Sequence, residues 1–118
     1  DLMTQTACRI RLCDFSDHQL LKKELAESCI LTNATSMGMA PDIETAPIPD
    51  ASYLADGLIV SDIIYNPKET RLLSMAKKKG LPCFGGTYML LYQGAEAFRL
   101  WTGKDMPVDL IKSKFFAG

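Results

Sequence analysis

The sequence lacks the features that mark several classes of protein. It holds a single histidine, and none of its four cysteines forms a Cys-x-x-Cys pair, so we expect no metal site. No apolar run approaches the roughly 18 residues that a membrane-spanning helix needs. The formal net charge is −1, which gives no electrostatic basis for binding nucleic acid or an anionic membrane. A small molecule is therefore the ligand class that the composition leaves open.

The start of the chain and its thiols give two further expectations. No signal peptide and no initiator Met stand at the beginning, and residues 1–6 resemble the tail of a helix already begun, so we expect a fragment of a longer protein. The cysteines at positions 8, 13, 29 and 83 lie in or beside apolar runs. Because free cysteine is usually buried and disulfides are rare in the cytoplasm, we predict buried, reduced thiols in a cytoplasmic protein.

The sequence does contain an alternation of strand and helix patterns. Its 118 residues, 47% of them hydrophobic, suffice for one core. We predict strands over residues 8–15, 29–32, 57–65 and 82–84, and helices over 16–28, 66–79, 87–103 and 106–115. This order is typical of an α/β fold with a mostly parallel sheet and right-handed crossovers.

Capping residues mark the expected helix starts. Ser16 followed by Gln19 forms a capping box. Asn66 is expected to cap the next helix, because Pro67 behind it fits the first helical position. The core-facing positions of these two helices are predicted at Leu21, Leu25, Leu72, Leu73 and Ala76.

The remaining segments differ in their expected exposure. Residues 8–15 alternate polar and apolar side chains, which predicts a strand with one exposed face near a sheet edge. Residues 29–32 are continuously apolar apart from a threonine, which predicts a buried strand. Residues 40–56 hold three prolines and are expected to form a surface excursion with a short turn near residues 49–54.

The segment that follows residues 82–84 has the strongest functional signal. Gly85 and Gly86 end an apolar run, and paired glycines let a backbone approach a ligand closely. The helix after them is apolar on nearly every side, so we expect burial of more than one face. Gln93 is its polar exception. A buried amide there would either satisfy a loop backbone or contact a ligand.

Residues 33–39 follow a predicted strand and are small or hydroxyl-bearing. At the carboxyl end of a strand in an α/β sheet, such residues suit a ligand crevice. The same residues also suit a plain turn closed by the Asn33 side chain. Both readings stay open at this point.

Three stretches in register carry a resemblance to a known family. They are Leu-Thr-Asn-Ala-Thr-Ser-Met-Gly-Met at 31–39, Asp-Ile-Ile-Tyr-Asn-Pro at 62–67, and Gly-Thr-Tyr-Met-Leu-Leu-Tyr-Gln-Gly-Ala at 86–95 with Leu-Trp-Thr-Gly at 100–103. Their order and spacing resemble the carboxyl-terminal portion of the shikimate/quinate dehydrogenase family. The resemblance implies part of a Rossmann-like, doubly wound NAD(P)-binding domain over residues 1–103, closed by a carboxyl-terminal helix over residues 104–118.

The resemblance also implies an activity and its site. Members of this family reduce 3-dehydroshikimate to shikimate with NADPH in aromatic amino acid (chorismate) biosynthesis, and a quinate/shikimate branch uses NAD. The reaction is a reversible hydride transfer between nicotinamide and a carbonyl carbon. By resemblance, the substrate-contacting positions are Tyr65 and Gln93, and the cofactor-lining positions are Ala34, Thr35, Ser36, Ile63, Asn66, Gly86 and Met89.

Parts of the family pattern are altered or absent in this chain. Tyr88 stands where the family often has a small residue, and we expect it either to narrow the pocket mouth or to alter nicotinamide packing. The Gly-rich phosphate loop and the catalytic Lys and Asp of the amino-terminal substrate domain have no match here. We therefore expect no catalytic residue in the chain, and no activity from the chain alone.

The resemblance sets an expected strand order as well. It makes residues 8–15, 29–32, 58–65 and 82–84 the equivalents of strands 3 to 6 of a Rossmann sheet, whose order is 3-2-1-4-5-6. Strands 1 and 2 have no match in this chain. We therefore expect parallel pairing of the last three strands, with residues 8–15 displaced, swapped or disordered, because a strand without neighbours leaves its backbone groups unpaired.

Two other functions stay open. One is another two-domain dehydrogenase that shares this Rossmann half. The other is a regulatory protein that binds a quinate-like ligand without turnover. In each case the expected partners are a small-molecule ligand and an amino-terminal substrate domain.

Overall fold

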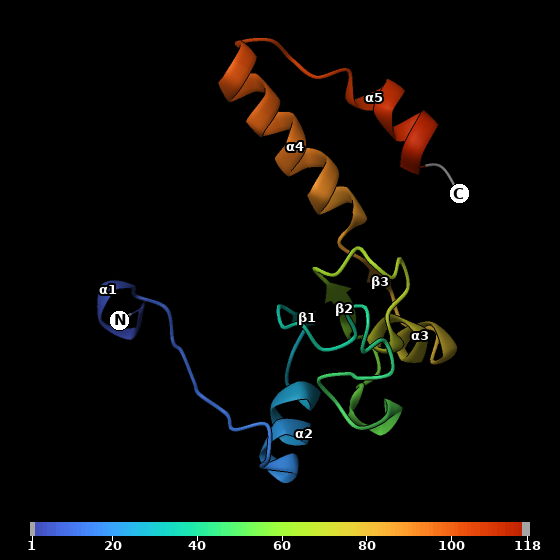
Figure 1. The fold of residues 1–118 in the computed structure, drawn as a ribbon. Helices are drawn as coiled ribbons and strands as arrows, with labels where there is room; N and C mark the ends of the chain where they lie inside the picture. The colour runs from blue at the N-terminus through green and yellow to red at the C-terminus, as the bar shows by residue number, and fades with distance from the viewer. Residues whose placement is uncertain (1, 117–118) are drawn as a thin grey trace.

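The structure, a computed structural model, describes residues 2–116 (Figure 1). Along the chain lie α1 (Leu2–Gln5), α2 (His18–Ala26), β1 (Ile30–Asn33), the 3₁₀ turn η1 (Ala51–Tyr53), β2 (Ile59–Asp62), α3 (Arg71–Lys78), β3 (Cys83–Phe84), α4 (Thr87–Thr102), α5 (Val108–Ile111) and the π-helical turn η2 (Lys112–Phe116). None of the helices among these residues is long and apolar enough to cross a membrane.

The strands form one parallel sheet in the order β1-β2-β3. Ile30 pairs with Ile59 and Asn33 with Asp62, while Val60 of the central strand also pairs with Cys83. The last three predicted strands and their parallel pairing are thus confirmed, and α3 is the crossover between β2 and β3. Parallel pairing brings the carboxyl ends of β1 and β2 to the same edge of the sheet.

The hydrophobic core lies on one face of this sheet. Val60 is its centre, with Leu31 and Cys83 packed around it from the neighbouring strands. All five predicted helix positions, Leu21, Leu25, Leu72, Leu73 and Ala76, are buried in it. The proline-rich excursion adds Ile48 and Leu54, so this segment is part of the core as well as the surface, which its polar composition did not predict.

The predicted strand over residues 8–15 is wrong. The described residues place no strand beside it, and the segment runs as an extended connection from α1 to α2 (Figure 1). Arg11 ties it to α2 through an ion pair with Glu24 at 2.9 Å. Alternation alone does not make a strand when no ladder partner is present. The segment is displaced from the sheet, as the pairing argument expected.

Both predicted helix caps are also wrong. Asp17, not Ser16, caps α2, because its carboxylate accepts from Leu20 N at 3.0 Å while Ser16 donates to Asp14 at 2.7 Å. Thr70, not Asn66, caps α3, and it accepts from Leu73 N at 3.3 Å. In each case the true cap lies nearer the helix than the sequence pattern placed it.

The thiols and the β1 strand are less buried than predicted. All four cysteines are free, but two are exposed and two half-buried. In β1 the side chains of Ile30 and Thr32 are exposed, because no helix among the described residues covers that face of the sheet. Ile59 and Phe84 extend the same open face across β2 and β3.

Helix α4 is the largest departure from expectation. Only Leu91 is buried along its length, while Trp101 is 83% exposed, so the predicted burial on several faces is wrong within this chain. Figure 1 shows α4 and α5 extending away from the sheet. The radius of gyration is 16.8 Å. A compact domain of this length has about 13.5 Å. The predicted helix end is confirmed, because Gly103 closes α4 with a φ of 69°.

We expect Leu54→Ala to lower the free energy of unfolding by about 2–5 kcal/mol, because it removes a core side chain that is 0% exposed. Ile43→Ala, in the same excursion but 45% exposed, is the control and should stay within about 0.5 kcal/mol of wild type. Urea unfolding of the two variants makes the comparison. Equal losses would contradict the placement of Leu54 in the core.

Candidate functional site

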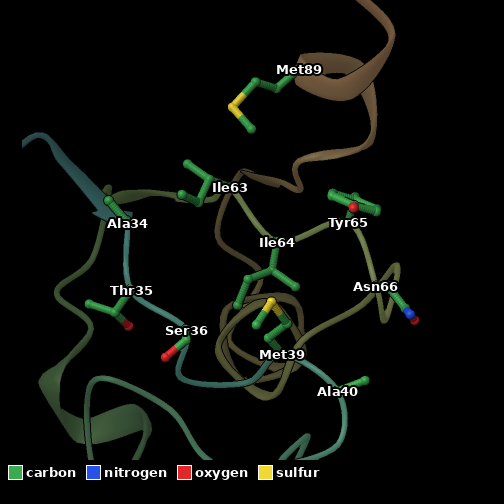
Figure 2. A pocket seen from close by; sticks show the side chains of 10 residues that line it. All are labelled: Ala34, Thr35, Ser36, Met39, Ala40, Ile63, Ile64, Tyr65, Asn66 and Met89. Atoms are coloured by element: carbon green, nitrogen blue, oxygen red, sulfur yellow. The ribbon is translucent and has the colours of Figure 1, made fainter. Parts of the chain in front are cut away.

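A cavity of about 530 Å³ opens where β1 and β2 end (Figure 2). Its volume lies within the roughly 300–1,000 Å³ typical of small-molecule sites. The carboxyl edge of a parallel sheet is also where α/β proteins bind ligands. The lining residues are Ala34, Thr35, Ser36, Met39, Ala40, Ile63, Ile64, Tyr65, Asn66 and Met89. They come from the segment after β1, the segment after β2, and the first turn of α4.

The turn after β1 is built by the Asn33 side chain. Its Oδ1 accepts hydrogen bonds from the Thr35 backbone N at 3.1 Å and from Thr35 Oγ1 at 2.7 Å. Its Nδ2 donates to the Met37 carbonyl at 3.0 Å. The turn reading of residues 33–39 is therefore confirmed, and this turn places Ala34, Thr35 and Ser36 in the cavity wall. The ligand-crevice reading stays a prediction.

Gly86 brings α4 to the cavity by close backbone contact. Its N donates to the Ile64 carbonyl at 3.0 Å, and a Cβ built on it would lie 1.9 Å from the Ile63 carbonyl oxygen. Only glycine allows the chain to pass so near the segment after β2. This contact starts α4 beside the cavity, and Figure 2 shows Met89 reaching from α4 toward Ile63.

The cavity wall combines apolar surface with neutral hydrogen-bonding groups. Ala34, Ile63 and Met89 give apolar surface, while Thr35, Ser36 and Asn66 give donors and acceptors. The ten lining residues include no lysine or arginine. Among its lining residues the cavity therefore offers neutral hydrogen-bonding groups and no cation that could pair with a phosphate.

Comparison with known proteins finds similarity to one family. The family model described as Shikimate 5'-dehydrogenase C-terminal domain matches residues 86–114. Shikimate dehydrogenase (NADP(+)) from Listeria innocua is 49% identical over 113 residues, which are 96% of this chain and 39% of that protein. The chain is thus similar to the carboxyl-terminal part of shikimate dehydrogenases.

Solved structures show the same similarity. Shikimate 5-dehydrogenase from Listeria monocytogenes, crystallised with shikimate and NAD, is 47% identical and matches 95% of this chain and 39% of its own, with a TM-score of 0.86. Quinate dehydrogenase from Corynebacterium glutamicum in complex with NAD is 33% identical. The match covers 84% of this chain and 34% of that protein, with a TM-score of 0.73. The Rossmann-like α/β fold is thereby confirmed, and the chain spans about two-fifths of the length of these relatives.

The structure gathers most of the positions that the family resemblance singled out. Seven of the nine line the cavity, namely Ala34, Thr35, Ser36, Ile63, Tyr65, Asn66 and Met89. Gly86 does not line the cavity but lies behind its wall, against the backbone of Ile63. The individual roles of these residues in the shikimate dehydrogenase site stay predictions.

Gln93 is not the buried amide that the sequence suggested. It is exposed, and its Nε2 donates to the Leu90 carbonyl at 3.2 Å within its own helix. The reason is that no element among residues 2–116 covers this side of α4. Gln93 does lie one turn beyond Met89, on the same helix stripe, and so faces the direction of the cavity.

Tyr88 does not narrow this cavity, which corrects a second expectation. It lines a separate hollow of about 450 Å³ beside β3, where the ammonium of Lys112 lies 4.8 Å from its ring centre. Lys77 lines the same hollow, and its hydrogen bond to the Glu69 carboxylate raises the pKa of the lysine. Successive helix positions point about 100° apart, which places Tyr88 and Met89 in different hollows.

Sequence reasoning missed two residues that support the site. Asp62 and Thr70 are both buried and hydrogen-bond to each other at 2.8 Å. The register that pairs Asn33 with Asp62 was the available signal, because it sets an amide beside a carboxylate at the strand ends.

Gly86→Ala should cost at least about 3 kcal/mol of unfolding free energy, since the added methyl would overlap the Ile63 backbone, which cannot rotate away. Gly94→Ala in the middle of α4 is the matched control. Its Cβ would meet nothing within 4 Å, so we expect a gain of about 0.5–1 kcal/mol. Denaturant unfolding followed by circular dichroism measures both. A Gly86→Ala variant as stable as wild type would refute the close approach.

Proposed function

We propose that this chain is the carboxyl-terminal part of a cytoplasmic shikimate dehydrogenase, which interconverts 3-dehydroshikimate and shikimate with NADP(H) or NAD(H) in aromatic amino acid biosynthesis. The observation that carries the proposal is the cavity at the carboxyl ends of β1 and β2, where seven positions implied by the family lie together. Relatives named for the NADP(+)-dependent enzyme support it. Within it, residues 1–103 belong to the NAD(P)-binding domain and residues 104–118 to a carboxyl-terminal segment that closes it.

In this proposal the chain orients the cofactor ring. A bound nicotinamide supplies or accepts the hydride. Ile63 and Met89 would hold the ring by apolar contact, and Thr35 and Asn66 would offer it hydrogen bonds. Holding the ring at a fixed angle to the substrate carbon lowers the barrier, because the reacting atoms start in attack geometry.

Tyr65 and Gln93 bind the hydroxyacid substrate in the same scheme. Tyr65 lines the cavity with a half-exposed ring, and Gln93 follows Met89 by one turn along α4. Both side chains can hydrogen-bond the ring hydroxyls of shikimate or quinate. No lysine, aspartate or glutamate lines the cavity, so proton transfer falls to the part of the relatives that precedes this match.

The open surfaces support a larger protein around this chain. The exposed sheet face holds Ile30, Ile59 and Phe84, and α4 exposes Leu100 and Trp101. Exposed apolar area of this extent marks contact sites. We propose that the amino-terminal portion, about three-fifths of the relatives' length, covers both surfaces and closes the cavity.

The full-length protein should oxidise shikimate with NADP⁺ or NAD⁺, and the 118-residue chain alone should show no turnover. The chain lacks the proton-transfer pair and the phosphate loop that the family requires. Reduction of NADP⁺ and of NAD⁺ is followed at 340 nm, with shikimate and with quinate as substrates. The rates show whether the protein turns over and which substrate and cofactor it prefers. Comparable rates from the chain and the full-length protein would sink the proposal, and cofactor or quinate binding without turnover would favour the regulatory alternative.

In the full-length protein, Tyr65→Phe and Gln93→Ala should each lower kcat/KM for the substrate by roughly 5–150-fold, the usual effect of losing a hydrogen bond to a substrate hydroxyl. KM for the cofactor should change little. Tyr53→Phe in η1 and Gln19→Ala in α2 are controls for the same chemical changes away from the cavity. If both site variants keep wild-type kcat/KM, their assigned roles are wrong.

A further inference from the structure

A buried carboxylate stands directly behind the cavity wall. Asp62 ends the central strand β2 and is 3% exposed. The ion pairs among residues 2–116 do not include it, and its hydrogen-bond donors are neutral groups. Burying a carboxylate without a cation is costly unless hydrogen bonds replace its water. The positions of the hydrogen-bond donors to Asp62 show which parts of the chain this carboxylate holds together.

Two of the donors belong to the chain segments beside the cavity, and the third lies at the start of α3. Asn33 Nδ2 donates to both carboxylate oxygens at 3.2 Å. The backbone N of Ile64 donates to Oδ1 at 3.0 Å. Thr70 Oγ1 donates to Oδ2 at 2.8 Å from the start of α3. A single side chain thus joins the turn after β1 to the segment after β2.

The Asp62 carboxylate also orients the Asn33 amide. An ionised carboxylate only accepts hydrogen bonds, so the NH₂ group of Asn33 must face it. The carbonyl of Asn33 then faces the opposite way, where it accepts from the backbone N and the hydroxyl of Thr35. With the amide reversed, Thr35 would lose its acceptor and Asp62 would meet a second oxygen. The turn that carries Ala34, Thr35 and Ser36 therefore depends on Asp62.

We propose that Asp62 is a positioning residue for cofactor binding. Through Asn33 it fixes the turn of residues 34–36, and through Ile64 N it fixes the segment of residues 63–66, so that both walls of the cavity meet the nicotinamide in one geometry. This role rests on the proposed function, and it adds a residue that does not itself line the cavity.

The test uses the full-length protein and measures cofactor binding apart from turnover. The variants are Asp62→Ala, Asp62→Asn and Asn33→Ala. Ser61→Ala is the control, because Ser61 is the buried residue of β2 next to Asp62. Its hydroxyl donates a hydrogen bond to the Thr32 hydroxyl of β1 at 2.9 Å and, among the described residues, to no group of the cavity. Calorimetry gives Kd for NADP⁺ and NAD⁺ without substrate, steady-state kinetics gives KM and kcat, and thermal unfolding shows which variants are folded at the assay temperature.

Asp62→Ala should raise Kd and KM for the cofactor on the order of 10- to 100-fold, the scale of a small misplacement of binding groups. Asn33→Ala should do the same, and the double variant should be no worse than either single one, because both act through one link. Asp62→Asn should recover most of the affinity, since its carbonyl still accepts from Asn33 and Ile64. Ser61→Ala should bind like wild type.

The outcomes separate the two proposals. A wild-type protein that binds neither cofactor overturns the proposed function. A wild-type protein that binds and turns over, with folded Asp62→Ala and Asn33→Ala variants of unchanged Kd, overturns the positioning role alone. If Asp62→Ala does not fold, Asn33→Ala decides, because it removes the same link and keeps the carboxylate in place.

Discussion

The parallel pairing of β1 with β2 is the constraint on which the site depends. Its register sets Asn33 beside Asp62 at the carboxyl ends of the two strands, and both side chains are buried on the core side of the sheet. A shift of one residue would turn both side chains to the open face and separate the segments that follow them. The hydrophobic core around Val60 therefore does more than stabilise the chain. It fixes the register that lets an amide and a carboxylate organise the cavity.

Within the part of the chain that the structure describes, the sheet is covered on one face only. One face is covered by α2, α3 and the proline-rich excursion, while the other leaves Ile30, Ile59 and Phe84 exposed. Parallel sheets are normally covered on both faces, because their crossover helices pack on both. Helix α4 shows the same imbalance, with an apolar composition and a single buried residue, Leu91. These exposed surfaces agree with a chain that spans about two-fifths of the length of its shikimate dehydrogenase relatives.

Sequence patterns predicted well those features that depend on neighbouring residues. The three strands, the core stripes of α2 and α3, the helix end at Gly103 and the turn near Ala51–Tyr53 all follow from local periodicity or from glycine and proline. Failures came where a distant partner decides the outcome. Residues 8–15 alternate like a strand but have no ladder partner, and Thr70 displaces Asn66 as a cap because Asp62 holds its hydroxyl. Asp62 itself was missed, because a carboxylate gives no sign of burial until its donors are known.

Under the proposed function, the make-up of the cavity divides the work of a dehydrogenase between two parts of the protein. A site that held the whole dinucleotide would need cations or a glycine-rich helix start for the phosphates, and neither lines this cavity. Its walls instead combine apolar surface from Ile63 and Met89 with hydroxyl and amide groups held by buried hydrogen bonds. Such walls can hold a ring through apolar contacts and neutral hydrogen bonds, but they supply neither a strong electrostatic anchor nor a proton. In the proposed function, orientation is thus the contribution of this chain, and it requires that the groups behind the wall be as rigid as the wall itself.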